Sequence, residues 1–255
     1  MAEFDFRSLP AIWTRELIIF KRYWQGTTFT AVLEPLVFLF AIGLGVGAFV
    51  DEIDGMEYVV FVGTGAVATA VLFSSVFPGM YNTFIARVFQ KVYDGILSTP
   101  TTTAELMVGE ATWVAARTAV YGCVPMLATI PFGLQARWTM LWVPFICFIA
   151  ALGLTFLGQY ISGVVKVIDS FSYFQSALLT PLLFVSGTYF PISGLPDWFG
   201  KISNVNPVYH CIELVRDACF GRLSWASWWH VLALVVFASI TGTLSVRVMT
   251  KRLIT

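Results

Sequence analysis

Residues 140–164 read MLWVPFICFIAALGLTFLGQYISGV, an apolar stretch that contains no charged residue. Such a run is typical of a helix that crosses a lipid bilayer, because a hydrocarbon core of roughly 30 Å takes about 20 apolar residues in helical conformation. Similar runs occur elsewhere in the chain. The sequence predicts an all-α polytopic membrane protein with six transmembrane helices, over residues 31–50, 58–77, 106–130, 140–164, 171–190 and 228–249.

The composition agrees with a membrane protein. Of the 255 residues, 58% are hydrophobic and 12% are charged, whereas a soluble domain has about 45–50% apolar and about 25% charged residues. The 15 basic residues are balanced by 15 acidic ones, which leaves no positive surplus for nucleic-acid binding. Six spans also leave too little chain for a soluble catalytic domain.

Lysine and arginine residues between the predicted spans indicate the orientation, because short cytoplasmic loops retain them. With the N-terminus inside, the cytoplasmic segments contain Arg7, Arg15, Lys21, Arg22, Arg87, Lys91, Lys166, Arg247, Lys251 and Arg252. The outer side holds Arg137, Lys201, Arg216 and Arg222. We therefore expect both termini to be cytoplasmic, and no cleavable signal peptide.

Residues 1–30 precede the first predicted span and carry an apolar stripe. Its members recur at steps of four, three and four, namely Trp13, Leu17, Phe20 and Trp24. Arg15 and Arg22 lie on the opposite side. The pattern favours an N-terminal amphipathic helix that lies in the membrane interface. The alternative is an ordinary juxtamembrane flank whose basic side chains reach the head groups.

Residues 81–96 form a second amphipathic segment, after the second predicted span. It is too polar to span the membrane and too apolar to lie free in water, so it needs lipid or a protein partner to cover it. We expect Gly95 and Pro100 to limit this helix. A simple continuation of the second span explains part of the segment but not its polar tip.

The predicted outer loop, residues 191–227, is unusually apolar and contains Pro191, Pro196 and Pro207. Backbone at membrane depth must be hydrogen-bonded internally. We therefore predict two short re-entrant or surface-lying helices, split near Asn206 and Pro207. The alternative is a free extracellular loop. The residues of this segment with a predicted role are Pro191, Pro196, Trp198, Asn206, Pro207, Glu213 and Arg216.

Taken in order, these segments resemble the membrane subunit of ABC-2 type exporters over nearly the whole chain. Three motifs carry the resemblance: GILSTP at residues 95–100, SGTYFPISGLP at 186–196, and NPVYH at 206–210 followed by ELVR at 213–216. Glu34-Pro35, the glycine-rich first span and the acidic hairpin at residues 51–57 are most similar to the branch that exports nodulation-type lipo-oligosaccharides. Drug and polysaccharide exporters share the C-terminal pattern.

The resemblance implies a half-transporter in the bacterial inner membrane. Two copies of this chain in a homodimer, or this chain and a close relative, would pair with two cytosolic ABC ATPase subunits. ATP and Mg would bind the partner subunit, and this chain would not be an enzyme. The Gly200-Lys201 pair is followed by Ile202, which does not fit a Walker A motif. The residues expected to couple to the ATPase are Lys91, Val92, Tyr93, Asp94, Gly95, Leu97, Thr99 and Pro100.

An amphipathic lipid-linked or glycan substrate would suit an aromatic path. The candidates for this path are Phe38, Phe73, Arg117, Phe184, Tyr189 and Phe190, and core packing is the alternative for the aromatic residues. Ionisable residues at membrane depth mark function by default, and here they are Glu34, Glu110 and Arg117. We expect a structural role for Glu110, whereas structural and substrate-binding roles stay open for Arg117.

Two alternatives come from other functional classes. A proton-coupled secondary transporter would use Glu34, Glu110 and Arg117 as a relay, but it predicts inverted repeats that the sequence lacks. A membrane scaffold leaves both amphipathic segments without a purpose. The four cysteines and two histidines have neither disulfide nor metal-ligand spacing. The Gly43 and Gly47 pair predicts close helix packing in the first span.

Overall fold

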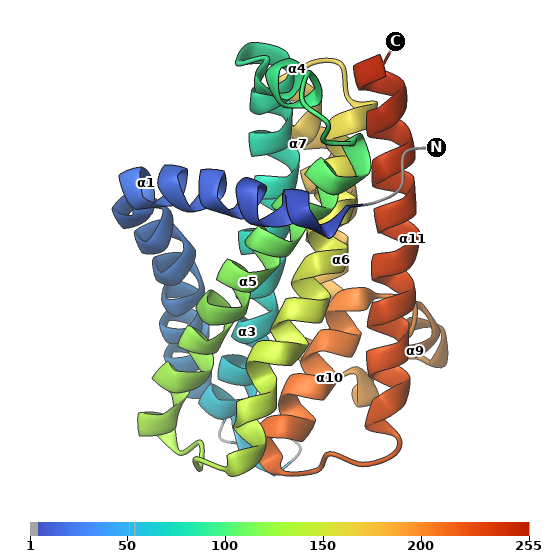
Figure 1. Ribbon diagram of the computed structural model, residues 1–255. Coiled ribbons are helices and arrows are strands. Elements are labelled where there is room, and N and C mark those ends of the chain that lie inside the picture. The colour runs from blue at the N-terminus through green and yellow to red at the C-terminus, as the bar shows by residue number, and fades with distance from the viewer. Residues whose placement is uncertain (1–4, 51, 54, 255) are drawn as a thin grey trace.

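Long helices make up most of the structure, a computed structural model that describes residues 5–50, 52–53 and 55–254. Figure 1 shows them as a bundle in which the main helices run side by side. Their bounds are α1 (Leu9–Phe38), α3 (Tyr58–Phe77), α5 (Thr103–Thr129), α6 (Val143–Val164), α10 (Pro207–Phe220) and α11 (Ser227–Ile254). The prediction of an all-α polytopic membrane protein is confirmed.

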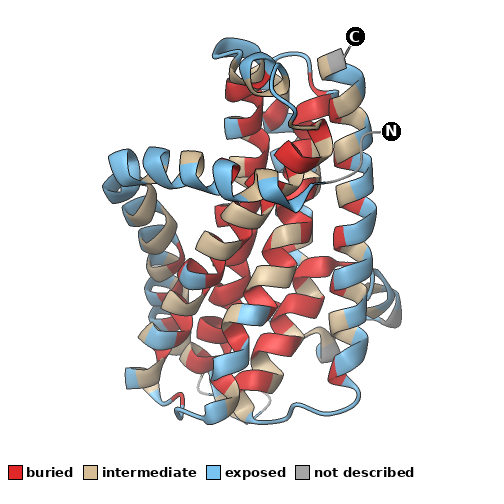
Figure 2. Cartoon of the chain, in the orientation of Figure 1, coloured by how far each residue is buried: buried red, intermediate tan, exposed pale blue. Residues whose placement is uncertain are grey.

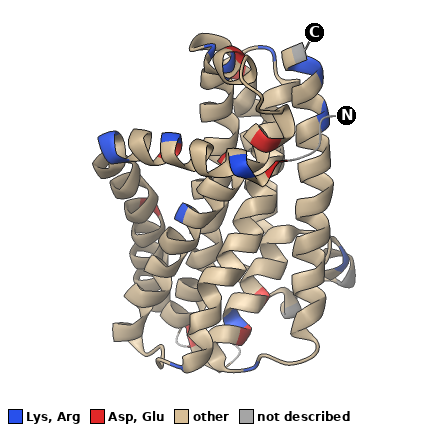
Figure 3. Ribbon diagram, in the orientation of Figure 1, with Lys and Arg blue, Asp and Glu red and all other residues tan. Residues whose placement is uncertain are grey.

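Within the described residues, 5 helices are long and apolar enough to cross a membrane. They span Phe6–Gly47, Tyr58–Phe89, Thr103–Phe132, Trp138–Val164 and Ser227–Leu253. Four of the predicted spans lie entirely within these helices: 58–77, 106–130, 140–164 and 228–249. The predicted span 31–50 lies within the first helix as far as Gly47. Figure 3 shows that long stretches of these helices carry no charged residue. These stretches correspond to the apolar runs from which the spans were predicted.

The predicted span 171–190 is shorter than expected. Its helical part consists of η7 (Ile168–Ser170), α7 (Phe171–Phe174), η8 (Gln175–Leu179) and α8 (Thr180–Phe184). At 1.5 Å per residue this is about 25 Å, less than a hydrocarbon core of roughly 30 Å. The chain turns at Ser186 and Gly187, where Gly187 has a φ of 79° that favours glycine. The helix therefore ends six residues before the predicted limit.

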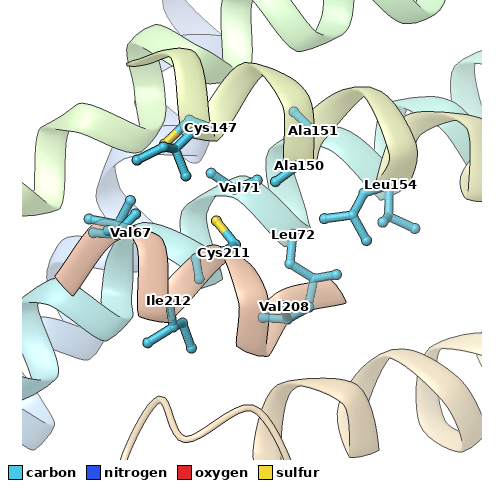
Figure 4. Packing of buried hydrophobic residues seen from close by; sticks show 14 of the residues in the cluster. Val67, Val71, Leu72, Cys147, Ala150, Ala151, Leu154, Val208, Cys211 and Ile212 are labelled. Carbon is cyan, nitrogen blue, oxygen red and sulfur yellow. The ribbon is translucent and has the colours of Figure 1, made fainter. Parts of the chain in front are cut away.

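The core centres on α3, which is buried along nearly its whole length (Figure 2). Figure 4 shows buried side chains of α3, α6 and α10 that belong to this core; the labelled ones are Val67, Val71, Leu72, Cys147, Ala150, Ala151, Leu154, Val208, Cys211 and Ile212. Large apolar side chains on the outside of α1 and α11 stay exposed, as expected of surfaces that face lipid.

The first helix changes direction. Figure 1 shows the N-terminal part of α1 lying across the bundle, after which the chain turns and runs along it. Around Gly26, the hydroxyls of Thr27 and Thr30 donate to the carbonyls of Tyr23 and Gly26 at 3.1 and 2.9 Å, a pattern that bends helices. The crossing part has the arrangement expected of an interfacial helix.

After α1 the chain continues through η2 (Leu39–Leu44) and α2 (Gly45–Gly47) into a hairpin of β1 (Glu52–Ile53) and β2 (Met56–Glu57). The two strands pair antiparallel, with Glu52 opposite Glu57. Of the acidic hairpin expected from the sequence, Asp51 and Asp54 lie outside the described residues.

Two helices form the predicted outer segment, as expected. After η9 (Ile192–Gly194) come α9 (Asp197–Ser203) and α10, and the break falls at Asn206. The Asn206 Oδ1 accepts from the backbone N–H of Val208 at 2.9 Å, and its Nδ2 donates to the Leu182 carbonyl at 2.6 Å. Asn206 therefore caps α10 and ties it to α8. Because α10 packs into the core, this segment is not a free loop.

Candidate functional site

The second amphipathic segment divides into a helical extension and a short separate helix. η3 (Pro78–Asn82) and η4 (Ile85–Phe89) prolong α3, and α4 (Val92–Leu97) follows at one end of the bundle. Lys91 between them has a φ of 52°, which breaks the helix. The continuation interpretation thus holds as far as Phe89. Gly95 does not limit the helix, which runs through it to Leu97.

A buried polar cluster connects α4 to two other helices. Tyr93 is fully buried, and its hydroxyl donates to Glu110 Oε2 of α5 at 2.5 Å. The other carboxylate oxygen of Glu110 accepts from Arg15 Nη1 of α1 at 3.0 Å. Burial, with the adjacent Glu110 carboxylate, raises the pKa of the Tyr93 hydroxyl well above its usual value. The hydroxyl therefore remains a hydrogen-bond donor across the neutral pH range.

This cluster explains Glu110 in structural terms. Glu110 does not pair with Arg117, which lies seven positions further along α5. Its partner is Arg15, and Arg15 also binds Glu16 at 2.9 Å. Apolar side chains of Ala86, Leu106, Met107 and Met249 enclose Tyr93. The cluster joins α4, α5 and the crossing part of α1 into one unit.

A second link at the same end of the bundle involves Glu105, a residue that the sequence interpretation missed. Thr102 and Glu105 form a capping box at the start of α5, and Glu105 Oε1 also accepts from the backbone N–H of Asp5 at 2.7 Å. Asp5 precedes η1 (Phe6–Ser8) and α1. The Thr-x-x-Glu signature was visible in the sequence, but its contact with the N-terminal segment was not.

The residues predicted to couple to the ATPase differ in accessibility. Tyr93 is enclosed and cannot contact another protein, so its role is to position α4. Val92 and Leu97 are half-buried, whereas the exposed members are Lys91, Asp94, Gly95, Thr99 and Pro100. The exposed members form a polar surface at the tip of α4, which we call the α4 tip.

The aromatic residues predicted to line a path fall into separate groups. Tyr189 brings Phe38 and Phe184 together, with ring centroids 6.3 and 5.9 Å from its own. The Tyr58 hydroxyl donates to the Tyr189 carbonyl at 3.3 Å. Phe73 lies apart and stacks on Phe77 at 5.3 Å.

Phe190 lies against Phe199 of α9, with 6.5 Å between ring centroids. Four residues of the predicted outer segment line a cavity of ≈ 560 Å³; they are Pro191, Pro196, Glu213 and Arg216.

In this cavity, the Arg216 guanidinium lies 4.0 Å from the centre of the Phe61 ring and donates to the Gly187 carbonyl at 3.0 Å. Glu213 pairs with Arg216 at 3.6 Å. Trp198 of α9 is exposed, and Pro207 is buried in the first turn of α10. Arg216 thus fastens α10 to α3 and to the turn after α8.

Arg117 and Glu34 occupy cavities along α1. Arg117 lines a cavity of ≈ 450 Å³ under the crossing part of α1, together with Arg15, Glu16, Phe20 and Trp113. Glu34 is exposed and lines a neighbouring cavity. Within the described residues, no group of three or more His, Cys, Asp or Glu side chains is placed to hold a metal ion, and the four cysteines are free thiols.

The sequence model for the ABC-2 type transporter matches residues 7–220. The chain belongs to the ABC-2 type transporter family. This multi-pass ABC-2 permease is 31% identical over 244 residues to nodulation protein J of Sinorhizobium fredii, an alignment that covers 96% of this chain and 93% of the relative. To nodulation protein J of Rhizobium meliloti it is 27% identical, over 95% and 93% of the two chains.

A more distant relative is the inner membrane transport permease YadH of Escherichia coli, 23% identical over 84% of this chain and 83% of the relative. The resemblance of the sequence motifs to ABC-2 exporters is thus confirmed. As a membrane component of a transporter, an ABC-2 permease is not itself an enzyme.

Proposed function

We propose that this chain is the membrane subunit of an ATP-driven exporter, in which two copies pair with two cytosolic ATPase subunits that bind ATP and Mg. The exporter moves an amphipathic lipid-linked or glycan substrate, similar to a lipo-oligosaccharide, out of the cytoplasm or the inner leaflet. Both termini face the cytoplasm of a bacterial cell, on the side of α4. The substrate class follows from the resemblance of the first span and the acidic hairpin to the branch that exports nodulation-type lipo-oligosaccharides. The nodulation protein relatives, aligned over nearly the whole chain, agree with that branch.

The observation that carries the proposal is the Tyr93–Glu110–Arg15 cluster beneath the exposed α4 tip. A force applied to the α4 tip would pass through the Tyr93–Glu110 hydrogen bond, 2.5 Å long, to α5. It would then pass through the Glu110–Arg15 contact of 3.0 Å to the crossing part of α1. Rigid-body movement of linked helices is a common route for such switching. The arrangement suits a permease that is driven by a partner from that side.

The charges at membrane depth do not favour a proton relay. Glu110 is occupied by Arg15 and Tyr93, whereas the guanidinium of Arg117 lies against the rings of Phe20 and Tyr121. Glu34 lines a different cavity from Glu110. A relay requires a connected chain of groups that exchange protons. Arg117 lines both cavities, but no ion pair among the described residues joins it to Glu34 or to Glu110.

The α4 tip is tested by replacing its acidic residue. We expect Asp94→Lys to lower ATP turnover by the complex of this chain with its genomically adjacent ATPase, and to lower co-purification of the two. Thr99→Val, at the end of the tip, should have a smaller effect in the same direction. Both positions are exposed, so neither change should affect folding of the bundle. ATP turnover per complex is the measurement.

Asp169→Lys is the matched control, because Asp169 is also exposed and lies in η7, outside α4. It should retain wild-type turnover. If replacements throughout residues 92–100 leave both co-purification and turnover unchanged, the assignment of α4 as the coupling segment is refuted.

A further inference from the structure

Arg117 is a half-buried cation whose guanidinium is not fully paired. Its Nε atom is enclosed and has no hydrogen-bond partner in the part of the chain that the structure describes. The guanidinium lies 6.0 Å from the Phe20 ring and 5.9 Å from the Tyr121 ring. Such contacts favour a cation, but they do not replace a hydrogen bond, and a buried donor without an acceptor is costly.

The two carboxylates that line the same cavity, Glu16 and Glu110, already bind another arginine. Glu16 and Glu110 both accept from Nη1 of Arg15, at 2.9 and 3.0 Å. Within the described part of the chain, Arg117 makes no ion pair with either of them. The cavity of ≈ 450 Å³ is large enough for a small head group beside Arg117. The site therefore offers a guanidinium to an anion from outside the chain.

A groove leads away from Arg117 along α1. The cavity under the crossing part of α1 shares Thr27, Pro78 and Arg117 with a second cavity of ≈ 190 Å³. The second shares Thr30 and Glu34 with a third of ≈ 260 Å³. The remaining residues of the third cavity are apolar: Phe29, Leu33, Val37 and Phe38.

Most of these apolar side chains are exposed on the outside of the bundle. The series of cavities, which we call the α1 groove, therefore changes from charged to apolar and ends on a surface suited to lipid. Its polarity matches that of a molecule with an anionic head and an alkyl tail.

We propose that the α1 groove binds an anionic amphiphile, with its oxyanion on Arg117 and its alkyl chain along α1. A guanidinium binds phosphate-like oxygens through paired N–H donors, which a neutral head group cannot match in strength. Glu34 places a carboxylate further along the groove, which disfavours a second anion there. Binding of the amphiphile does not depend on the proposed function. If the chain is the proposed exporter, the bound amphiphile is its cargo, and this step alone rests on that function.

The test measures equilibrium binding of dodecyl phosphate to the purified chain in a nonionic detergent. Two comparison probes are used: inorganic phosphate, which lacks the tail, and octaethylene glycol monododecyl ether, which lacks the charge. We expect dodecyl phosphate to bind more tightly than both. Arg117→Gln should weaken its binding by about ten- to a hundredfold, the loss typical of a charge-assisted hydrogen bond.

Arg117→Lys keeps the charge and should lose less than Arg117→Gln. The matched control is Arg22→Gln, which removes an exposed arginine of α1 that lines none of the three cavities. It should bind as the wild type does.

Thr30→Trp tests the tail site without touching Arg117, because Thr30 is exposed and lines the second and third cavities. It should weaken binding of dodecyl phosphate but not of inorganic phosphate.

Three results would overturn the inference: equal binding of the neutral probe, unchanged binding by Arg117→Gln, or inorganic phosphate binding as tightly as dodecyl phosphate. The last result would assign the site to a free anion. Because the binding assay contains no ATPase, a negative binding result would not affect the proposal that α4 couples to the ATPase, which the Asp94 variant tests. Conversely, failure of the Asp94 test would not alter the binding result.

Discussion

Replacing Glu110 with leucine is expected to uncouple the ATPase from this permease. The change removes the acceptor of the buried Tyr93 hydroxyl and one partner of Arg15. Each charge-assisted hydrogen bond contributes about 1.5 to 3 kcal/mol. Loss of the Tyr93 bond alone should therefore shift the population of correctly placed α4 by about tenfold or more. ATP turnover of the complex is the readout, with thermal unfolding measured in parallel.

Glu16→Gln is the matched control for this variant. Glu16 also binds Arg15, at 2.9 Å, but no hydrogen bond links it to Tyr93. It should retain most of the coupled turnover. If Glu110→Leu retains wild-type turnover, α4 does not depend on the cluster, and the proposed route of force transmission is wrong.

The second large effect is expected where two helices touch through glycine. A Cβ atom added to Gly158 of α6 would lie 2.5 Å from the Val76 carbonyl oxygen, and one added to Gly79 of η3 would lie 2.6 Å from that of Thr155. Backbone atoms cannot rotate away as side chains can. Gly158→Ala should cost about 1 to 3 kcal/mol, and Gly158→Leu should prevent recovery of folded protein.

Thermal unfolding in detergent measures this effect. The matched control is Gly45→Ala, because Gly45 is helical and a Cβ there would meet nothing within 4 Å. That variant should be neutral or slightly more stable, since alanine favours a helix over glycine. An unfolding temperature of Gly158→Ala equal to that of the wild type would contradict the close contact.

The helices could be predicted from the sequence because a segment that crosses the lipid hydrocarbon core needs about 20 consecutive apolar residues. The apolar runs, the break at Asn206 and Pro207 and the amphipathic segment after the second span all follow from local chemistry. The end of the helix at Phe184 was misplaced, although Ser186 and Gly187 supplied a turn signal. Apolar content continues past that turn to Phe190, and hydropathy alone does not register a turn.

Contacts between distant segments were not predictable in the same way. Glu110 and Arg15 are 95 positions apart, and no single sequence shows which two charges will meet. Tyr93 was grouped with the exposed coupling residues because its helical face could not be assigned before its neighbours were known.

The glycines show the same limit. Close packing was expected at Gly43 and Gly47, where a Cβ would have ordinary contacts of 3.5 and 3.6 Å. Tighter approaches occur at other glycines, among them Gly79 and Gly158, which belong to different segments. Small residues indicate where helices can approach, and the fold decides where they do.

We propose that ATP hydrolysis by a partner subunit drives an amphipathic glycan-bearing lipid through this permease. The direct measurement follows a fluorescent acylated oligosaccharide across proteoliposomes that contain the chain and its genomically adjacent ATPase. Movement is expected with ATP and Mg, and not with a non-hydrolysable analogue or with a proton gradient alone. Movement of a drug but not of the oligosaccharide would contradict the substrate class. Movement driven by a proton gradient without the ATPase would contradict ATP-driven export and favour a secondary transporter.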